Sequence, residues 1–335
     1  MARYDFASDN VAGAMPEALD ALVRFNSGFE AGYGADGVSA RAADLIRELL
    51  NVDAEVWFVA SGTAANSLAL GALVAPHEAA LSHEYAHIAM DETGAPGFFG
   101  AGLGIIGLAG ASGLIDPSAL AAALARPDTP HGQAPAALSL TQATEFGAVY
   151  RGEALADLTG QAQAAGVSLH LDGARLANAA AAGFDLKSLP RLGIDIAVMG
   201  GTKAGAPPTE ALILLSEGAR RRFGARLKHG GQLISKARFL SAPWIGMLET
   251  GAWVRRAAHA NAMAQRLAAL MPFPIAHPVQ ASGVFVEMDD QALARLNQAG
   301  WFVYRFVDGT ARFMCSWATT PEAVDELGEV LKGIA

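Results

Sequence analysis

Two apolar stretches of the chain each end on a residue type that carries chemistry. The first stretch, residues 167–171, runs directly into Asp172, and the second, residues 194–199, leads through two glycines and a threonine to Lys203. A helical segment separates the two stretches, which is typical of neighbouring strands in an open α/β sheet. Ligands bind at the carboxyl ends of the strands in such a sheet. The sequence therefore predicts that Asp172 and Lys203 lie together at a ligand site.

Pyridoxal 5′-phosphate (PLP) is a cofactor that an acid and a lysine at this edge suit well. It needs a carboxylate against its pyridine nitrogen and a lysine that forms a Schiff base with its aldehyde. Three glycines crowd Lys203 and two prolines follow it, which indicates a backbone held against another group. Taken alone, each residue has an ordinary alternative: Asp172 could cap a helix, and Lys203 could be a surface lysine at a strand end.

Strands and helices alternate along most of the chain. Strands are expected at residues 55–60, 79–82, 104–109, 136–141 and 210–216, and helices at residues 16–25, 39–50, 64–74, 117–124 and 151–165. This alternation predicts an α/β fold with a mostly parallel, doubly wound sheet. Ser39 is expected to cap its helix, and residues 96–100 and 227–232 are interpreted as glycine loops.

A long helical pattern over residues 252–270 leads into a smaller C-terminal α+β domain. The strands of that domain are expected at residues 283–288, 302–307 and 311–317, and Pro321 opens the last helix. We place the domain boundary so that residues 1–245 form the large domain, with an N-terminal arm, and residues 246–335 form the small one.

The turn at residues 61–63 joins a strand to a helix. Backbone N–H groups at the start of a helix, together with the helix dipole, favour an anion such as a phosphate. Many such turns bind nothing. Gly62 and Thr63 are therefore proposed as cofactor contacts only in combination with the acid and the lysine.

Composition limits the class of protein. The chain has 335 residues, of which 52% are apolar and 17% charged, enough for one large domain or a large and a small one. A net charge of −9 argues against a nucleic-acid-binding surface. No apolar stretch reaches the roughly 18 residues that span a bilayer, and the N-terminus has no signal core, so a soluble cytoplasmic protein is expected. The single cysteine, Cys315, excludes an intrachain disulfide and is interpreted as a buried hydrophobic residue.

Several short motifs resemble the threonine aldolase and β-eliminating lyase group of fold-type I PLP enzymes. They are residues 6–10 (FASDN), 33–36 (YGAD), 61–66 (SGTAAN), 86–88 (AHI), 138–142 (LSLTQ), 170–175 (HLDGAR) and 202–203 (TK). Their order and spacing follow this family over nearly the whole chain, more loosely in the last third. The resemblance implies a PLP-dependent aldolase that cleaves L-3-hydroxy-α-amino acids, such as L-threonine, L-allo-threonine or phenylserine-like compounds, to glycine and an aldehyde.

The resemblance also implies roles for individual residues. Lys203 would form the Schiff base, and Asp172 would hold the pyridine nitrogen. The other implied cofactor contacts are Arg175, His87, Gly62, Thr63 and Thr202. The implied substrate contacts are Ser8, Tyr33, Arg175 and Arg312. A guanidinium suits a carboxylate because its planar fork can donate two parallel hydrogen bonds.

Two histidines are candidates for the base that removes the substrate hydroxyl proton. The resemblance places His87 flat over the pyridine ring and His131, in a loop expected over residues 127–135, near the substrate hydroxyl. His83 and His87 are four positions apart and could bind a metal from one face of a helix. No third ligand is evident nearby, so no metal site is expected.

Fold-type I enzymes usually place the site at a dimer interface. The resemblance therefore implies a homo-oligomer with shared active sites, at least a dimer and usually a tetramer. Tyr33 and the loop at residues 32–37 would then come from the neighbouring subunit. Many relatives carry an arginine shortly after a double glycine, whereas this chain has the sequence QLISK at residues 232–236.

Three other functions are weighed against the aldolase. The same scaffold could catalyse β-elimination or transamination of an amino acid. A dinucleotide-binding oxidoreductase needs a G-x-G-x-x-G motif after a strand, whereas the glycines at residues 100–104 precede one. A non-catalytic binding protein has no need of the lysine and the acid together.

Overall fold

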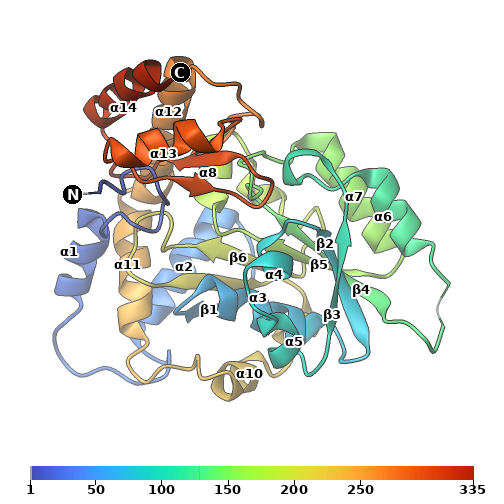
Figure 1. Ribbon diagram of the computed structural model, residues 1–335. Coiled ribbons are helices and arrows are strands. Elements are labelled where there is room, and N and C mark those ends of the chain that lie inside the picture. Colours follow the sequence, from blue (N-terminus) through green and yellow to red (C-terminus); the bar gives the residue numbers. More distant parts are fainter. Residues whose placement is uncertain (1, 128) are drawn as a thin grey trace.

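The centre of the protein is a seven-stranded sheet with the strand order β1-β7-β6-β5-β4-β2-β3 (Figure 1). Its strands are β1 (Glu55–Val59), β2 (Glu78–His83), β3 (Gly104–Leu108), β4 (Ala134–Thr141), β5 (Ser168–Asp172), β6 (Ile196–Gly200) and β7 (Glu210–Leu214). Strand β7 is antiparallel to both neighbours, whereas every pair from β6 across to β3 is parallel. The mostly parallel sheet is therefore confirmed.

The computed structural model describes residues 2–127 and 129–335. Met1 and Asp128, the latter within the loop expected over residues 127–135, lie outside this description. The helices are α1 (Pro16–Arg24), α2 (Gly37–Leu50), α3 (Gly62–Leu73), α4 (His87–Met90), α5 (Ala95–Phe99), α6 (Pro117–Leu124), α7 (Gly152–Ala164), α8 (Leu176–Ala181), α9 (Glu217–Arg220), α10 (Phe223–His229), α11 (Arg238–Glu249), α12 (Ala252–Leu270), α13 (Asp290–Gln298) and α14 (Pro321–Ile334).

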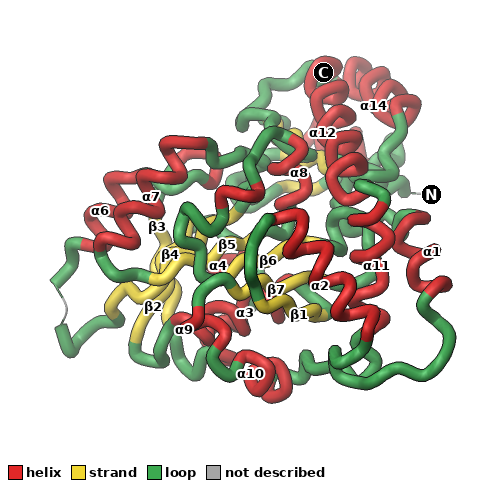
Figure 2. The backbone as a smooth tube through the Cα atoms, turned by 180° about the vertical axis from the view of Figure 1, so that it is seen from behind, coloured by secondary structure: helices red, strands yellow, loops and turns green. Residues whose placement is uncertain are grey.

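Helices cover both faces of the large sheet. Successive residues of a strand point to opposite faces. Accordingly Ala197 and Met199 of β6 share a core with α2 and α7, while Ile196 and Val198 of the same strand pack with α3 and α10. The view from behind shows α2 and α7 on the near side of the sheet (Figure 2). This two-sided burial makes the sheet doubly wound.

A second sheet lies in the C-terminal part of the chain. It has the strand order β8-β10-β9, with β8 (Gly283–Val286), β9 (Tyr304–Arg305) and β10 (Ala311–Met314), and all its pairs are antiparallel. These strands share a hydrophobic core with α12, α13 and α14. The N-terminal arm belongs to the same core, because Phe6 is buried in it and the carbonyl of Phe6 accepts a hydrogen bond from the N–H of Met314.

The two cores meet along α12. Ala257 packs in the core of the large sheet, whereas Ala264 and Leu267 pack in the core of the small one. The domain boundary expected between residues 245 and 246 falls inside α11. Its position stays a prediction.

Several local predictions were wrong. Helix α2 begins at Gly37 and is capped by Asp36, whose carboxylate accepts a hydrogen bond from the N–H of Ser39 at 2.7 Å. Residues 96–100 are largely helical in α5, because a proline suits the first turn of a helix. Residues 227–229 end α10, so the following glycines terminate a helix instead of filling a loop.

Among residues 2–127 and 129–335, no helix combines the length and the apolar character that crossing a membrane requires.

Candidate active site

Asp172 and Lys203 both lie at the carboxyl ends of two neighbouring parallel strands of the large sheet. Asp172 is the last residue of β5, and Lys203 lies in the turn that follows its parallel neighbour β6. Two glycines allow the two strand ends to approach. A Cβ atom on Gly173 would lie 2.1 Å from the carbonyl oxygen of Val198, and one on Gly200 would lie 2.2 Å from that of Ala174.

The carboxylate of Asp172 is buried and held in place by two hydrogen bonds. Its Oδ1 accepts a hydrogen bond from the N–H of Ala174 at 3.0 Å, and its Oδ2 accepts one from the side-chain amide of Asn66 at 2.9 Å. Burial alone would raise the pKa of Asp172, but the positive charge of Lys203 and the Ala174 N–H outweigh it and hold that pKa below its usual value. The alternative role as a helix cap does not apply, because the N-cap of α8 is Arg175. Asp172 is thus an ionised acceptor.

Lys203 lines a cavity of about 290 Å³ at this edge. Its side chain makes no hydrogen bond or ion pair with any residue that the structure describes. The backbone leading to it is anchored by the buried carboxylate of Glu210, which accepts a hydrogen bond from the N–H of Gly201 at 2.7 Å. The hydroxyl of Thr202 holds the same turn by accepting a hydrogen bond from the N–H of Thr209 at 3.1 Å. The amine is therefore presented to the cavity from a fixed backbone.

The first turns of α3 lie beside the carboxylate of Asp172. Ser61 caps the helix by accepting a hydrogen bond from the N–H of Ala64 at 3.3 Å. Asn66, one turn along α3, is the residue that reaches Asp172. A Cβ atom on Gly62 would meet nothing within 4 Å, so there is open space in front of Gly62. The helix start can therefore receive an anion.

His87 begins α4 and also lines the cavity. Its Nδ1 lies 2.8 Å from Oε1 of Glu92, a carboxylate with no exposed side-chain surface. The hydrogen bond to Glu92 raises the pKa of His87, while burial of the ring opposes the shift. His83 instead contacts the carbonyl of Gly110, and no cluster of metal-ligating side chains occurs among the described residues.

Arg175 does not offer a free guanidinium. Its Nε and Nη2 donate to the two carboxylate oxygens of Asp9 at 2.7 Å and 3.0 Å, and both side chains are buried. The remaining Nη1 lies 3.8 Å from the carboxylate of Glu145. Arg175 reaches the cavity wall with its planar fork already paired.

Arg312 of β10 is the arginine on the cavity wall that lacks a carboxylate partner among the described residues. It is buried against the rings of Tyr304 and Phe306, each 4.8 Å from its guanidinium carbon. Its Nη2 donates to the carbonyl of Ala7 and to the Tyr304 hydroxyl, and its Nε has no partner within the described part of the chain. Burial and the nearby Arg175 charge lower the pKa of Arg312 to about 10, so it is still a cation at neutral pH.

Of the other predicted site residues, one lines the cavity and two do not. Ser8 lines the cavity, where its hydroxyl accepts a hydrogen bond from the N–H of Asn10. Tyr33 is half exposed, lies under the ammonium group of Lys228 and does not line the cavity of its own chain. His131 is exposed in the loop before β4, at the opposite edge of the sheet from Asp172. The single chain therefore does not bring Tyr33 or His131 to the site.

Sequence reasoning missed several residues of the site. Asp9, Asn66 and Glu92 form the hydrogen bonds described above, and the residues missed on the cavity wall are Asn10, Tyr85, Met90, Asp91, Glu145, Tyr304, Arg305, Phe306 and Val307. Asp9 and Asn66 lie inside motifs that carry the family resemblance, so the motifs themselves contained a signal for them. Glu92 has no comparable signal, because an acidic residue after a short helix is normally exposed.

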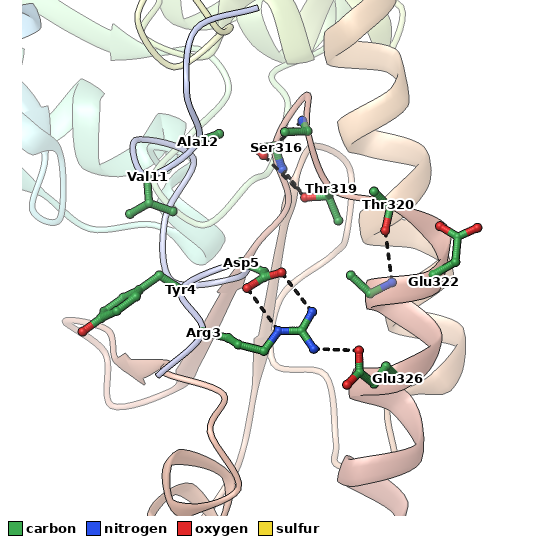
Figure 3. A pocket seen from close by; sticks show the side chains of 12 residues that line it. Arg3, Tyr4, Asp5, Val11, Ala12, Ser316, Thr319, Thr320, Glu322 and Glu326 are labelled. Carbon is green, nitrogen blue, oxygen red and sulfur yellow. Dashed lines mark hydrogen bonds and ion pairs between the residues drawn. The ribbon is translucent and has the colours of Figure 1, made fainter. Parts of the chain in front are cut away.

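A larger cavity of about 470 Å³ lies between the N-terminal arm and α14 (Figure 3). Among the described residues that line it, the one cation is Arg3, which is already paired with Asp5 at 3.1 Å and with Glu326 at 2.6 Å. Those residues include no lysine and no histidine. Size alone would favour this cavity over the one around Lys203, but the Lys203 cavity carries the groups suited to catalysis.

Comparison with known proteins agrees with this geometry. Residues 5–291 match the family described as beta-eliminating lyase. A low specificity L-threonine aldolase from Pseudomonas sp. (strain NCIMB 10558) is 43% identical over 98% of this chain and 97% of its own. The structure of threonine aldolase from Leishmania major, 31% identical, superposes with a TM-score of 0.93 and covers 99% of this chain and 100% of that one. Aspartate aminotransferase from Thermus thermophilus, at 18% identity, shares the fold, with a TM-score of 0.73 over 97% of this chain and 89% of that one. The chain belongs to the β-eliminating lyase family and, within it, to the threonine aldolase group.

Proposed function

We propose that this protein is a PLP-dependent aldolase that cleaves L-3-hydroxy-α-amino acids to glycine and an aldehyde. Two lines of argument support the proposal: the names of the full-length relatives and the chemistry of one cavity. The observation that carries it is that Lys203, His87 and Arg312 all line this cavity, while the ionised Asp172 lies at the end of the adjoining strand. An amine, an imidazole, a carboxylate-binding cation and an anionic acceptor are the groups that this reaction requires.

The residues present fit PLP. Lys203 would hold the cofactor aldehyde, Asp172 would accept a hydrogen bond from the protonated pyridine nitrogen, and the start of α3 at Gly62 and Thr63 would hold the phosphate. Thr202 would act by fixing the turn that presents Lys203. When bound, the cofactor supplies an electron sink for the electron pair left on the substrate Cα when a bond to it breaks.

Arg312 would bind the substrate carboxylate. A buried guanidinium without an anionic partner is a costly arrangement, and a bound carboxylate relieves it. Holding the carboxylate at one point fixes which bond at Cα is aligned for cleavage. Arg175 would contribute positive charge from the cavity wall and would tie Ser8 and the arm in place through Asp9.

His87 would accept the proton of the substrate hydroxyl. Of the two histidines predicted as candidates for the base, it is the one that lines the cavity in this chain. Its Nδ1 is engaged with Glu92, which leaves Nε2 on the side of Asp91, another cavity residue, at 3.6 Å. Removal of the hydroxyl proton allows Cα–Cβ cleavage and release of the aldehyde.

The cavity wall supports substrates with apolar side chains. Tyr85, Met90, Phe306 and Val307 all contribute to it. Their apolar surfaces would receive a methyl or phenyl substituent at Cβ. Phenylserine-like substrates therefore join L-threonine and L-allo-threonine in the proposed class.

A homo-oligomer would complete the site. The proposal is at least a dimer, and a tetramer as the larger assembly. Phe29, Tyr33 and Phe98 are large side chains exposed on the single chain, and a neighbouring subunit would cover such side chains at an interface. We propose that Tyr33 reaches the cavity of a neighbouring subunit. If the sites are shared, mixing and refolding Lys203→Ala protein with Tyr33→Ala protein should restore activity through hybrid sites, and light scattering should give at least a dimer.

The direct test is to incubate the PLP-loaded protein with L-threonine and measure the products. Acetaldehyde and glycine in equal amounts support the aldolase. A keto acid with free ammonia would mean β-elimination on this scaffold, and a keto acid without free ammonia would mean transamination. Lys203→Ala is the control: it should lose both the visible absorbance of the bound cofactor and the cleavage of threonine. A wild-type protein that stays colourless with added PLP would overturn the proposal.

A further inference from the structure

We propose that Glu92 is a positioning residue that fixes the ring orientation and the tautomer of His87, and that Asn66 connects this pair to Asp172. The inference rests on the proposed function, in which the Nε2 atom of His87 accepts the substrate hydroxyl proton. Neither Glu92 nor Asn66 was among the site residues predicted from the sequence.

Four side chains form one continuous chain of polar contacts beside the cavity. His87 Nδ1 lies 2.8 Å from Glu92 Oε1, and the side-chain amide of Asn66 donates to the same Glu92 oxygen at 2.8 Å. The amide of Asn66 also donates to Asp172 Oδ2 at 2.9 Å. Asn66 thus uses one NH₂ group to join two carboxylates.

Glu92 is held in a place where a carboxylate is costly. Its side chain has no exposed surface, and its Oε2 has no hydrogen-bond partner among the described residues. A buried carboxylate of this kind persists only where its partners require it. Any hydrogen-bond acceptor could satisfy the side-chain amide of Asn66. For His87, in contrast, the contact with Glu92 decides which ring nitrogen carries the proton.

The contact determines where the imidazole carries its proton. An ionised carboxylate can only accept hydrogen bonds, so the Nδ1 atom of His87 must bear the hydrogen. In the neutral ring the lone pair then resides on Nε2, which is the atom that a base needs. Without Glu92, the ring would be free to turn and to protonate on either nitrogen.

The charges around His87 act in the same direction on balance. Glu92 is the nearest, and the carboxylates of Glu145 and Asp172 also favour the imidazolium, as does Asp91 at 3.6 Å from Nε2. Lys203 and burial oppose it, and the net effect raises the pKa of His87. Burial in turn raises the pKa of Glu92, while His87 and Asn66 oppose that rise. Neutralising Glu92 therefore removes the strongest interaction that holds the proton on the ring.

The experiment compares the wild type with Glu92→Gln, and uses Glu84→Gln, an exposed site on the preceding loop, as the charge-matched control. Nitrogen-15 NMR of the cofactor-free protein reports the His87 tautomer and titration, assigned by the loss of its signals in His87→Gln. We expect the Nδ1–H tautomer in the wild type and in Glu84→Gln. In Glu92→Gln we expect a mixed tautomer and a ring that titrates about one pH unit lower.

The kinetic readout is the acid limb of the kcat/KM profile for threonine. It should move to lower pH in Glu92→Gln by the same amount as the NMR titration, and it should not move in Glu84→Gln. A wild-type His87 that carries its hydrogen on Nε2 would overturn the inference without the need for any variant, and so would a tautomer and titration unchanged in Glu92→Gln. A wild type that shows the expected tautomer but releases no acetaldehyde would reject the aldolase and leave the Glu92 assignment standing.

Discussion

The carboxylate of Asp9 and the guanidinium of Arg175 form an ion pair with two hydrogen bonds, 2.7 Å and 3.0 Å long, inside the protein. Asp9 comes from the N-terminal arm, and Arg175 follows β5, so the pair ties the arm to the edge of the sheet that carries Asp172. Burial would raise the pKa of Asp9, but Arg175 and Lys203 outweigh it and hold that pKa below its usual value. Both members of the pair are therefore charged at neutral pH.

Breaking this pair should destabilise the fold. Asp9→Ala leaves a buried guanidinium without its partner, and we expect a loss of about 3–5 kcal/mol in the free energy of unfolding. Urea denaturation of the cofactor-free protein measures it. The control is Asp5→Ala, which removes an exposed partner of Arg3 and should cost less than about 1 kcal/mol. Equal losses in the two variants would contradict the structural role given to Asp9.

Arg312→Lys should weaken substrate binding more than it slows the chemistry. The lysine keeps the positive charge but loses the fork that donates two hydrogen bonds to a carboxylate. Each charge-assisted hydrogen bond contributes about 1.5–3 kcal/mol, so we expect KM for threonine to rise about 10-fold to 100-fold. Arg266→Lys is the matched control, because Arg266 is paired with Asp325 and does not line this cavity. An unchanged KM in Arg312→Lys would remove Arg312 from the substrate site.

The carboxyl group of Glu210 should make the stability depend on pH. Burial raises the pKa of Glu210 to about 7, above the value near 4.5 expected in the unfolded chain. Between these two values only the unfolded chain releases the proton, so the free energy of unfolding falls as the pH rises from about 4.5 to 7. As the pH rises from 5 to 8, the free energy of unfolding should fall less in Glu210→Gln than in the wild type. The difference between the two decreases should be of the order of a few kcal/mol. Parallel pH profiles for the two proteins, measured by denaturation without cofactor, would refute this. Glu217→Gln, at an exposed site, controls for the change in charge.

Cys315 should be unreactive in the folded protein. Its side chain is fully buried in the core of the small domain, as the sequence predicted, and burial raises the pKa of the thiol. Thiolate is the form that attacks disulfide reagents. Labelling is therefore suppressed because Cys315 stays a thiol and because the reagent cannot reach it. We expect a chromogenic disulfide reagent to label the protein only after denaturant is added. Rapid labelling of the native protein would show that the core opens at β10.

The sequence was most informative where local pattern and sheet geometry agree. Apolar runs ending on Asp172 and Lys203 predict adjacent strands, and parallel pairing then brings both ends to one edge. The Arg312 side chain could be found only through a family resemblance, because a single arginine on a short strand has no distinctive pattern. Its place in the site depends on how the three-stranded C-terminal sheet, which carries Arg312, packs beside the large sheet.

Other parts of the site could not be predicted for physical reasons. Arg175 was expected to face the substrate, but its partner Asp9 lies far away in the chain, and no periodicity reports such a pair. The family resemblance placed His131 near the substrate hydroxyl, and in the single chain the direction of β4 puts the loop before it at the amino ends of the parallel strands, away from Asp172. Helix α11 was missed because Pro243 lies inside it, and a proline in the interior of a helix normally breaks the helix.

The arm residue Phe6 has a consequence for how the protein is made. Phe6 is buried in the same core as β10 and α14, so the first and last parts of the chain complete one domain. A ribosome releases the amino end first, yet that end has no finished core to enter until the final helix has emerged. The segment around Phe6 is therefore among the last to be buried, because the core that receives it is finished only after α14 has left the ribosome.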